Sequence, residues 1–257
     1  MKYIDKSTNQ IAGMALVNEL LADSWDGSIY YGADYDGLKK PKYKNRFTYL
    51  LLAEQGYHCC YCMKHILPAN TTLEHIIPQE VKEADFDDYL VVPELTNNVI
   101  YKNSFNRSTR VIPPAKYPHD IAYHNIIASC NSNSHCNNKR GDKPIKPLIY
   151  DPAIEIKVIY DRAGNIKCDE YENDLFNIGL LSTKNPLNLI RLIWYKLSQK
   201  YEELVQITSE AINDIINDLI TLFDDISIID NFLGEPSYNT EVIKYEWFFD
   251  YYKKNNN

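Results

Sequence analysis

The chain has 257 residues, of which 45% are hydrophobic and 24% are charged, and its formal net charge at pH 7 is −8. This composition is typical of a globular protein with a proper core, and the negative charge argues against indiscriminate binding to nucleic acid. No apolar run approaches the ~20 residues of a membrane-spanning helix. The first residues also lack the apolar stretch of a signal peptide, which predicts a cytoplasmic location, where six cysteines are better explained by metal binding than by disulfides.

Two helices are expected before residue 57. Residues 9–23 place apolar side chains at helical spacing, and one face of that helix would be formed by Ile11, Met14, Val17, Leu20 and Leu21. A second helix is expected at 43–55, before Gly56, which suits the left-handed position that follows a helix. Residues 1–56 are therefore predicted to form a helical lead-in.

A β-hairpin is expected within residues 60–80, with a turn around Pro68-Ala69-Asn70 and a strand through Thr71–Ile77. The polar segment that follows, up to Asn125, is longer than most loops, so it is expected to be functional or to carry structure of its own. After it, a short apolar run leads into Cys130, and a helix is expected to begin near Asn137.

The chain changes character beyond Pro147. Residues 1–150 contain sixteen acidic and seventeen basic side chains, whereas 151–257 contain nineteen and ten. The segments 154–159 and 165–168 flank Asp-Arg-Ala-Gly, which predicts a hairpin. Three helices are expected next: one with Asn185 as its N-cap and Pro186 as its first residue, one at 209–225 and one in the aromatic tail at 245–252. Residues 148–257 are thus predicted to be an acidic, mainly helical region that could dock a partner.

Cysteine and histidine are concentrated in one stretch. Eleven of the twelve lie between His58 and Cys136. Cys59-x-x-Cys62 has the spacing of a zinc knuckle, and Cys130-x5-Cys136 supplies a second pair about seventy residues later. Four thiolates in two distant pairs predict a structural zinc ion that holds separate segments together.

Other interpretations of these residues remain open. Buried free cysteines are one, and a redox Cys-x-x-Cys is another, although a redox pair would leave the second pair unexplained. His135 could replace Cys136 as the fourth ligand. Cys60 is expected to be a spectator, and His58 and His65 are expected at the surface.

A second group of polar residues is interleaved with the cysteines. Glu74 and His75 occur in Leu-Glu-His-Ile-Ile-Pro after the first pair, Asn125 precedes the second pair, and Asn137 directly follows Cys136. A lone histidine at a strand end is usually structural, but this neighbourhood favours a chemical role.

The order Cys-x-x-Cys, Glu-His-Ile-x-Pro, Asn-Ile-x-x-x-Cys and Cys-Asn-x-x-Arg-Gly-Asp resembles the HNH endonucleases, whose core is a ββα-metal finger. More narrowly, Leu-Ala-Glu-Gln-Gly-Tyr-His-Cys-Cys-Tyr-Cys and Cys-Asn-Asn-Lys-Arg-Gly-Asp-Lys look like the retron- and Septu-associated HNH proteins of the PtuB type. The resemblance covers about 45–145. It implies an α+β fold with a zinc-stapled ββα-metal nuclease core at 57–147, between N-terminal helices and a mainly helical C-terminal region.

The resemblance also implies roles for the motif residues. His75 would be the general base that deprotonates a water molecule, and Asn125 would orient His75 or the loop beside it. Glu74 and Asn137 would hold one divalent ion, Mg²⁺ or Mn²⁺, which would neutralise charge on the phosphate. The phosphate backbone would be contacted by Lys139, Arg140 and Lys143. Because the insertion before Asn125 and the stretched second knuckle are departures, Asn138, His124 and His135 are alternatives for some of these roles.

The implied activity is hydrolysis of nucleic-acid phosphodiester bonds, with DNA as the first expectation and RNA, including tRNA, as an alternative. In the resembled systems such a subunit works with an ATPase partner of the PtuA type in defence against phage. A different class of function is a zinc-stapled binding module without catalysis. A thiol oxidoreductase is the third.

Overall fold

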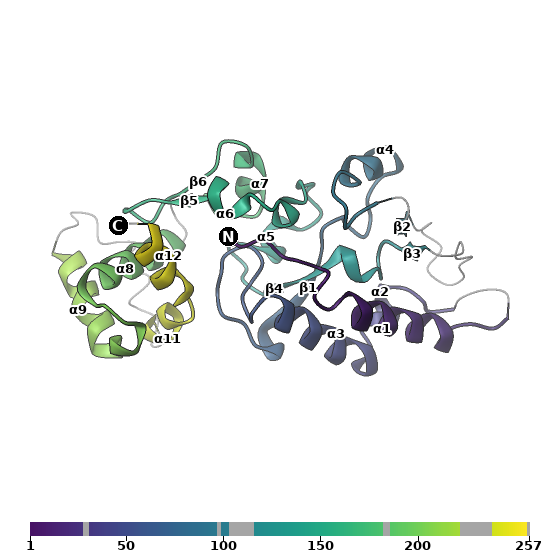
Figure 1. Ribbon diagram of the computed structural model, residues 1–257, viewed down its shortest axis with the longest axis horizontal. Helices are drawn as coiled ribbons and strands as arrows, with labels where there is room; N and C mark the ends of the chain where they lie inside the picture. Colours follow the sequence, from purple (N-terminus) through teal and green to yellow (C-terminus); the bar gives the residue numbers. More distant parts are fainter. Residues whose placement is uncertain (28–30, 97–98, 103–115, 182–185, 222–237, 256–257) are drawn as a thin grey trace.

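In a computed structural model of the chain, the described residues are 1–257 without 28–30, 97–98, 103–115, 182–185, 222–237 and 256–257. They form an α+β structure of helices and small two-stranded sheets. Figure 1 shows the N-terminal helices and the main sheet at one end, a group of C-terminal helices at the other end, and a hairpin with short helices between them.

The N-terminal helices are α1 (Gln10–Asp23), α2 (Tyr35–Leu38) and α3 (Pro41–Glu54), and α1 packs against α3. Leu16, Val17 and Leu20 on α1 are buried, whereas Ile11 is 88% exposed. The expectation that Ile11 belongs to the buried face is therefore wrong, because the buried face runs through Gly13, which lies against the Tyr123 ring. Gly56 has a φ of 60°, as the sequence predicts for the residue that ends α3.

The main sheet joins two segments that are distant in sequence. Strand β1 (Thr71–His75) pairs antiparallel with β4 (Ile126–Cys130), and His75 lies opposite Ile126. The short helix α5 (Asn137–Arg140) follows β4, with the predicted start. The expected hairpin within 60–80 is wrong, because η1 (Pro68–Asn70) leads into β1 and the partner of β1 lies beyond the long insertion.

The insertion between the two strands carries structure of its own. Its described elements are α4 (Glu83–Phe86), η2 (Asp87–Tyr89), β2 (Ile100–Tyr101), β3 (Tyr117–Pro118) and η3 (Tyr123–Asn125). Strands β2 and β3 pair in parallel, and the last turn delivers Asn125 to the start of β4.

The C-terminal region begins with η4 (Leu148–Tyr150), and then a short helix, α6 (Ile154–Lys157), occupies most of the segment that was expected to be a strand. The hairpin is shorter than predicted and consists of β5 (Ile159–Tyr160) and β6 (Ile166–Lys167). The elements that follow are α7 (Glu172–Asn177), α8 (Leu187–Lys200), η5 (Leu204–Gln206), α9 (Ser209–Ile220), α11 (Tyr238–Ile243) and α12 (Trp247–Asn255).

The expected helices of this region are found, and α9 ends at Ile220, before the predicted residue 225. Asn185 and residues 222–225 lie outside the described residues. The aromatic tail packs inward, with Phe248, Phe249 and Tyr252 buried. None of the described helices has the length and apolarity needed to cross a membrane.

The C-terminal helices contact the segment that directly follows the first cysteine pair. The Lys64 ammonium lies 2.5 Å from a carboxylate oxygen of Glu241 on α11, and the His65 amide donates to the Lys244 carbonyl at 2.6 Å. Buried apolar side chains from all three predicted segments form one contiguous cluster. The cysteine-rich stretch therefore lies at the junction between the sheet and the C-terminal helices.

Candidate metal centre and the surroundings of His75

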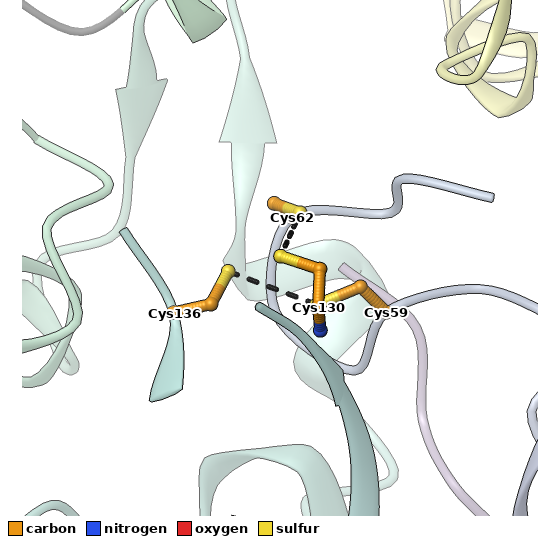
Figure 2. A group of neighbouring side chains, drawn as sticks. All are labelled: Cys59, Cys62, Cys130 and Cys136. Carbon is orange, nitrogen blue, oxygen red and sulfur yellow. Dashed lines mark hydrogen bonds between the residues drawn. The ribbon is translucent and has the colours of Figure 1, made fainter. Parts of the chain in front are cut away.

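The structure brings the four predicted cysteine ligands together. Cys59 and Cys62 lie in the turn after α3, Cys130 ends β4, and Cys136 immediately precedes α5. All four are buried, their sulfur atoms lie within 4.8 Å of one another, and Figure 2 shows the side chains converging. Within the described ranges they are the only group of three or more His, Cys, Asp and Glu side chains that could hold a metal ion.

The sulfur geometry fits a tetrahedral metal ion. The Cys59 and Cys136 sulfurs are 3.7 Å apart, and those of Cys62 and Cys130 are 3.8 Å apart. Zinc–sulfur bonds of about 2.3 Å in a tetrahedron place two sulfurs about 3.8 Å apart. The Cys130 amide also donates to the Cys59 sulfur at 3.3 Å, which would stabilise a thiolate. The four cysteines could therefore bind a structural metal such as zinc.

The turn that carries the first pair has the backbone of a metal knuckle. The Met63 amide donates to the Cys59 carbonyl at 3.2 Å, and Met63 has a φ of 63°. This left-handed conformation lets the chain reverse directly after Cys62. Cys136 has the same φ, 63°, where the chain enters α5.

The other cysteine and histidine residues nearby stay outside the cluster. Burial raises the pKa of the Cys60 thiol well above its usual value, which fits the expected spectator role. His135 Nδ1 lies 3.0 Å from the hydroxyls of Ser132 and Ser134. The fourth sulfur is that of Cys136, so the His135 alternative is not what the structure contains. His58 and His65 are half-buried rather than at the surface, with ring centroids 5.9 Å apart.

His75 ends β1 in a largely enclosed position. Its Nε2 lies 2.9 Å from the Asp120 carbonyl, and its ring meets the Tyr35 ring edge-on with centroids 4.5 Å apart. A carbonyl oxygen can only accept, so Nε2 carries the hydrogen and the Nδ1 lone pair is left as the proton acceptor. Burial lowers the pKa of His75 to about 4, which keeps the ring neutral at pH 7.

Asn125 holds the segment that follows His75. Its side-chain oxygen accepts from the Ile77 amide at 2.7 Å, and its amide nitrogen donates to the carbonyls of Ile77 and His119 at 3.0 and 2.8 Å. The side chain is fully buried, and all three bonds go to backbone groups. Asn125 thus contacts the loop beside His75 rather than its ring.

Glu74 and Arg140 form a buried ion pair. The side chain of Glu74 is 4% exposed and that of Arg140 is 1% exposed. Glu74 Oε1 also accepts from the Tyr61 hydroxyl at 2.9 Å. Burial raises the pKa of Glu74, although Arg140 and Tyr61 act in the opposite direction.

The guanidinium of Arg140 is fully engaged inside the protein. Besides Glu74, it donates to the carbonyls of His75, Ile76 and Lys143. An enclosed guanidinium with these partners does not fit the expected contact with a phosphate backbone. Arg140 instead ties the end of β1 to the end of α5, while Lys139 and Lys143 are exposed.

Asn137 lies on the Glu74 side of β1. Its amide nitrogen donates to the Thr72 hydroxyl at 3.2 Å. Because side chains alternate along a strand, Thr72 and Glu74 share one face, and His75 points to the other. The alternative residue Asn138 bonds to Asn131 and Asn133 within the second knuckle. The other alternative, His124, is buried, and burial lowers its pKa to about 4.

Sequence reasoning missed several residues that surround the motif. Asp120 fixes the His75 ring through its backbone carbonyl, which no side-chain pattern can reveal. Tyr35, the first residue of α2, packs on His75 from forty residues earlier in the chain, and its hydroxyl donates to the Leu73 carbonyl at 3.2 Å. Tyr61 stands between two cysteine ligands, and that position is the one available signal for its contact with Glu74.

Comparison with known proteins adds no relative. No protein-family model, characterised protein or solved structure matches the chain. The functional assignment therefore depends on the residues and geometry described above.

Proposed function

We propose that the chain is an HNH-type endonuclease that hydrolyses phosphodiester bonds of nucleic acid, most simply DNA, and that it acts with an ATPase partner of the PtuA type in antiviral defence. The observation that carries the proposal is the state of His75. A neutral histidine, held by a backbone carbonyl through Nε2, ends the first strand of a strand–strand–helix unit closed by four cysteines.

The residues around His75 suit a general base. A neutral imidazole whose Nδ1 lone pair is available can take a proton from water, and Nε2–H donation to Asp120 stabilises the imidazolium that forms. Asn125 and Arg140 would act as positioning residues, because both bind the backbone of residues that follow Glu74. Lys139 and Lys143 are exposed cations at the end of α5 and would meet the phosphate backbone.

The divalent ion implied by the resemblance fits these residues poorly. Glu74 is enclosed and already compensated by Arg140, and Asn137 is bonded to Thr72. Mg²⁺ normally keeps several water ligands and needs open space beside a carboxylate. We therefore propose proton transfer by His75 and treat dependence on Mg²⁺ or Mn²⁺ as a variable of the assay.

One observation favours a second candidate function. His75 is only 8% exposed and Glu74 is neutralised, as expected for a zinc-stapled binding module that has lost or never had catalysis. Such a module would bind a partner or nucleic acid without cutting it. The proposed nuclease and the module differ in a single measurable property, which is strand cleavage.

The test measures nicking of supercoiled plasmid and cleavage of RNA, with and without Mg²⁺ or Mn²⁺, by protein co-purified with its neighbouring gene product. His75→Ala should slow cleavage by about 10²–10⁴-fold, the usual contribution of a general base, while the protein stays folded and keeps its zinc. His65→Ala, the same change at a half-buried histidine of the first knuckle, should leave cleavage intact. Equal cleavage by wild type and His75→Ala would exclude the proposed role, and binding without cleavage by the wild-type complex would favour the module.

A further inference from the structure

The chain between the end of α2 and the first turns of α3 is strongly basic. Residues 39–46 are Lys-Lys-Pro-Lys-Tyr-Lys-Asn-Arg, with five cationic and no acidic side chains, in a chain whose formal net charge is −8. We call residues 39–46 the basic segment. A local concentration of cations in an acidic protein attracts anionic ligands to one part of its surface. The five cations are all exposed: Lys39, Lys40, Lys42, Lys44 and Arg46.

Two cations of the basic segment lack an acidic partner. Lys42 and Arg46 pair with Glu19 on α1, at 3.2 and 2.7 Å. By contrast, no acidic side chain of the described residues pairs with Lys40 or Lys44. The Lys44 amide donates to the Lys40 carbonyl at 2.9 Å, so the two residues lie one helical turn apart. The side chain of Lys40 makes no capping bond to α3, which leaves its ammonium available to a ligand.

The basic segment begins beside His75. The Lys39 ammonium lies 4.6 Å from the centre of the Tyr35 ring, and the same ring meets the His75 ring with centroids 4.5 Å apart. Lys39 also pairs with Asp36 at 2.8 Å, but both side chains are exposed, and such a pair holds a lysine weakly. One tyrosine ring therefore separates an exposed cation from the proposed general base.

The other described neighbours of His75 enclose it. Asp120 and Arg140, which bond to His75, and Ile126, which lies opposite it in the sheet, are each at most 2% exposed. Tyr35 is half-buried, and the residues that follow it at the end of α2 are exposed. The α2 side is therefore the side on which His75 lies nearest to solvent.

The cations of α5 lie on the opposite side of β1. Arg140 on α5 pairs with Glu74, and side chains alternate along a strand, so His75 points away from α5. Lys139 and Lys143 would therefore meet the phosphate backbone at a distance from His75. A phosphate that lies beside His75 needs a cation on the α2 side.

We propose that the basic segment binds the phosphate backbone of the nucleic-acid substrate, with Lys40 and Lys44 on the backbone and Lys39 nearest to the phosphate beside His75. The inference rests on the proposed nuclease function and adds a substrate-binding surface on α2 and α3 to the contacts expected at α5. Each lysine that meets a phosphate releases a bound counterion from the nucleic acid, so the affinity should fall as the salt concentration rises.

The test measures binding of short fluorescein-labelled DNA and RNA to the full chain by fluorescence anisotropy at several salt concentrations. All proteins carry His75→Ala, so that the nucleic acid stays intact. Lys40→Gln and Lys44→Gln should each weaken binding about fivefold at ~0.15 M salt and lower the slope of log K against log salt by about 1. Lys196→Gln, the same change at an exposed position on α8, should change binding less than about twofold.

Several outcomes would overturn the proposal. Equal effects of the three substitutions would show attraction to net charge alone. Absence of DNA and RNA binding by the His75→Ala chain would exclude the surface. Displacement of the nucleic acid by poly-glutamate as readily as by unlabelled DNA would identify an acidic protein segment as the ligand.

The inference and the nuclease proposal fail in different ways. Plasmid cleavage by the co-purified complex, with unchanged binding in Lys40→Gln and Lys44→Gln, would remove this surface and leave the nuclease. Weakened binding in both variants, without cleavage by the complex, would keep the surface and remove the nuclease. Because both lysines are exposed, the thermal midpoints of these variants should match that of the His75→Ala chain.

Discussion

Replacing Asn125 by alanine should be among the most destabilising single changes near His75. The substitution removes three bonds, to the Ile77 amide and to the carbonyls of Ile77 and His119, in a place that solvent does not reach. An unsatisfied buried group costs about 1–3 kcal/mol. Relaxation and coupling among the three bonds limit the total, so we expect a loss of roughly 3–5 kcal/mol in the free energy of unfolding.

Urea unfolding followed by circular dichroism measures this loss. Asn138→Ala is the matched control, because Asn138 makes two side-chain bonds on the exposed surface of the second knuckle. We expect the control to change stability by less than about 0.5 kcal/mol. Similar small losses in both variants would show that Asn125 does not hold the loop beside His75.

Three further predictions concern charge and metal. Burial lowers the pKa of His75 to about 4, below its unfolded value of about 6.5, so the unfolded chain binds the proton first. His75 therefore makes the free energy of unfolding roughly 3 kcal/mol higher above pH ~6.5 than at pH ~4, and this difference is lost as the pH falls. Urea unfolding at several pH values should show that the free energy of unfolding depends less on pH in His75→Gln than in wild type. Metal analysis should find one zinc ion per chain. Cys136→Ser should lose the zinc and have a lower thermal midpoint, whereas Cys60→Ser should keep the zinc. Zinc in both variants would exclude the assigned ligand set. Arg140→Met should destabilise the chain by roughly 3–5 kcal/mol by leaving Glu74 buried and unpaired, and adding Glu74→Gln should restore part of this stability; no recovery would mean that the pair is not coupled.

The sequence correctly predicted features that depend on a few neighbouring residues. The spacing of Cys59 and Cys62 identifies a metal-type turn, because two ligands must come from one short segment. Gly56 marks the end of α3 since its left-handed conformation favours glycine. The starts of α5 and of the packed aromatic tail follow from local patterns in the same way.

Pairings over long distances could not be read from such patterns. Strand β1 pairs with β4, which begins more than fifty residues after the predicted hairpin turn. The periodicity of apolar residues identifies a strand but does not say which distant strand it pairs with. Ile11 fits the helical period but is exposed, because the buried face of α1 runs through Gly13, Leu16, Val17, Leu20 and Leu21. In the sequence, Arg140 is one of several neighbouring basic residues and was expected at the surface. The fold instead buries it in an ion pair with Glu74.

The rate of plasmid nicking by the His75→Ala variant, relative to wild type, tests the central claim most directly. Both proteins should be zinc-loaded and co-purified with the partner, and compared at a temperature where both are fully folded. The account predicts a loss of about 10²–10⁴-fold, the usual contribution of a general base. A variant that nicks the plasmid as fast as wild type would contradict it.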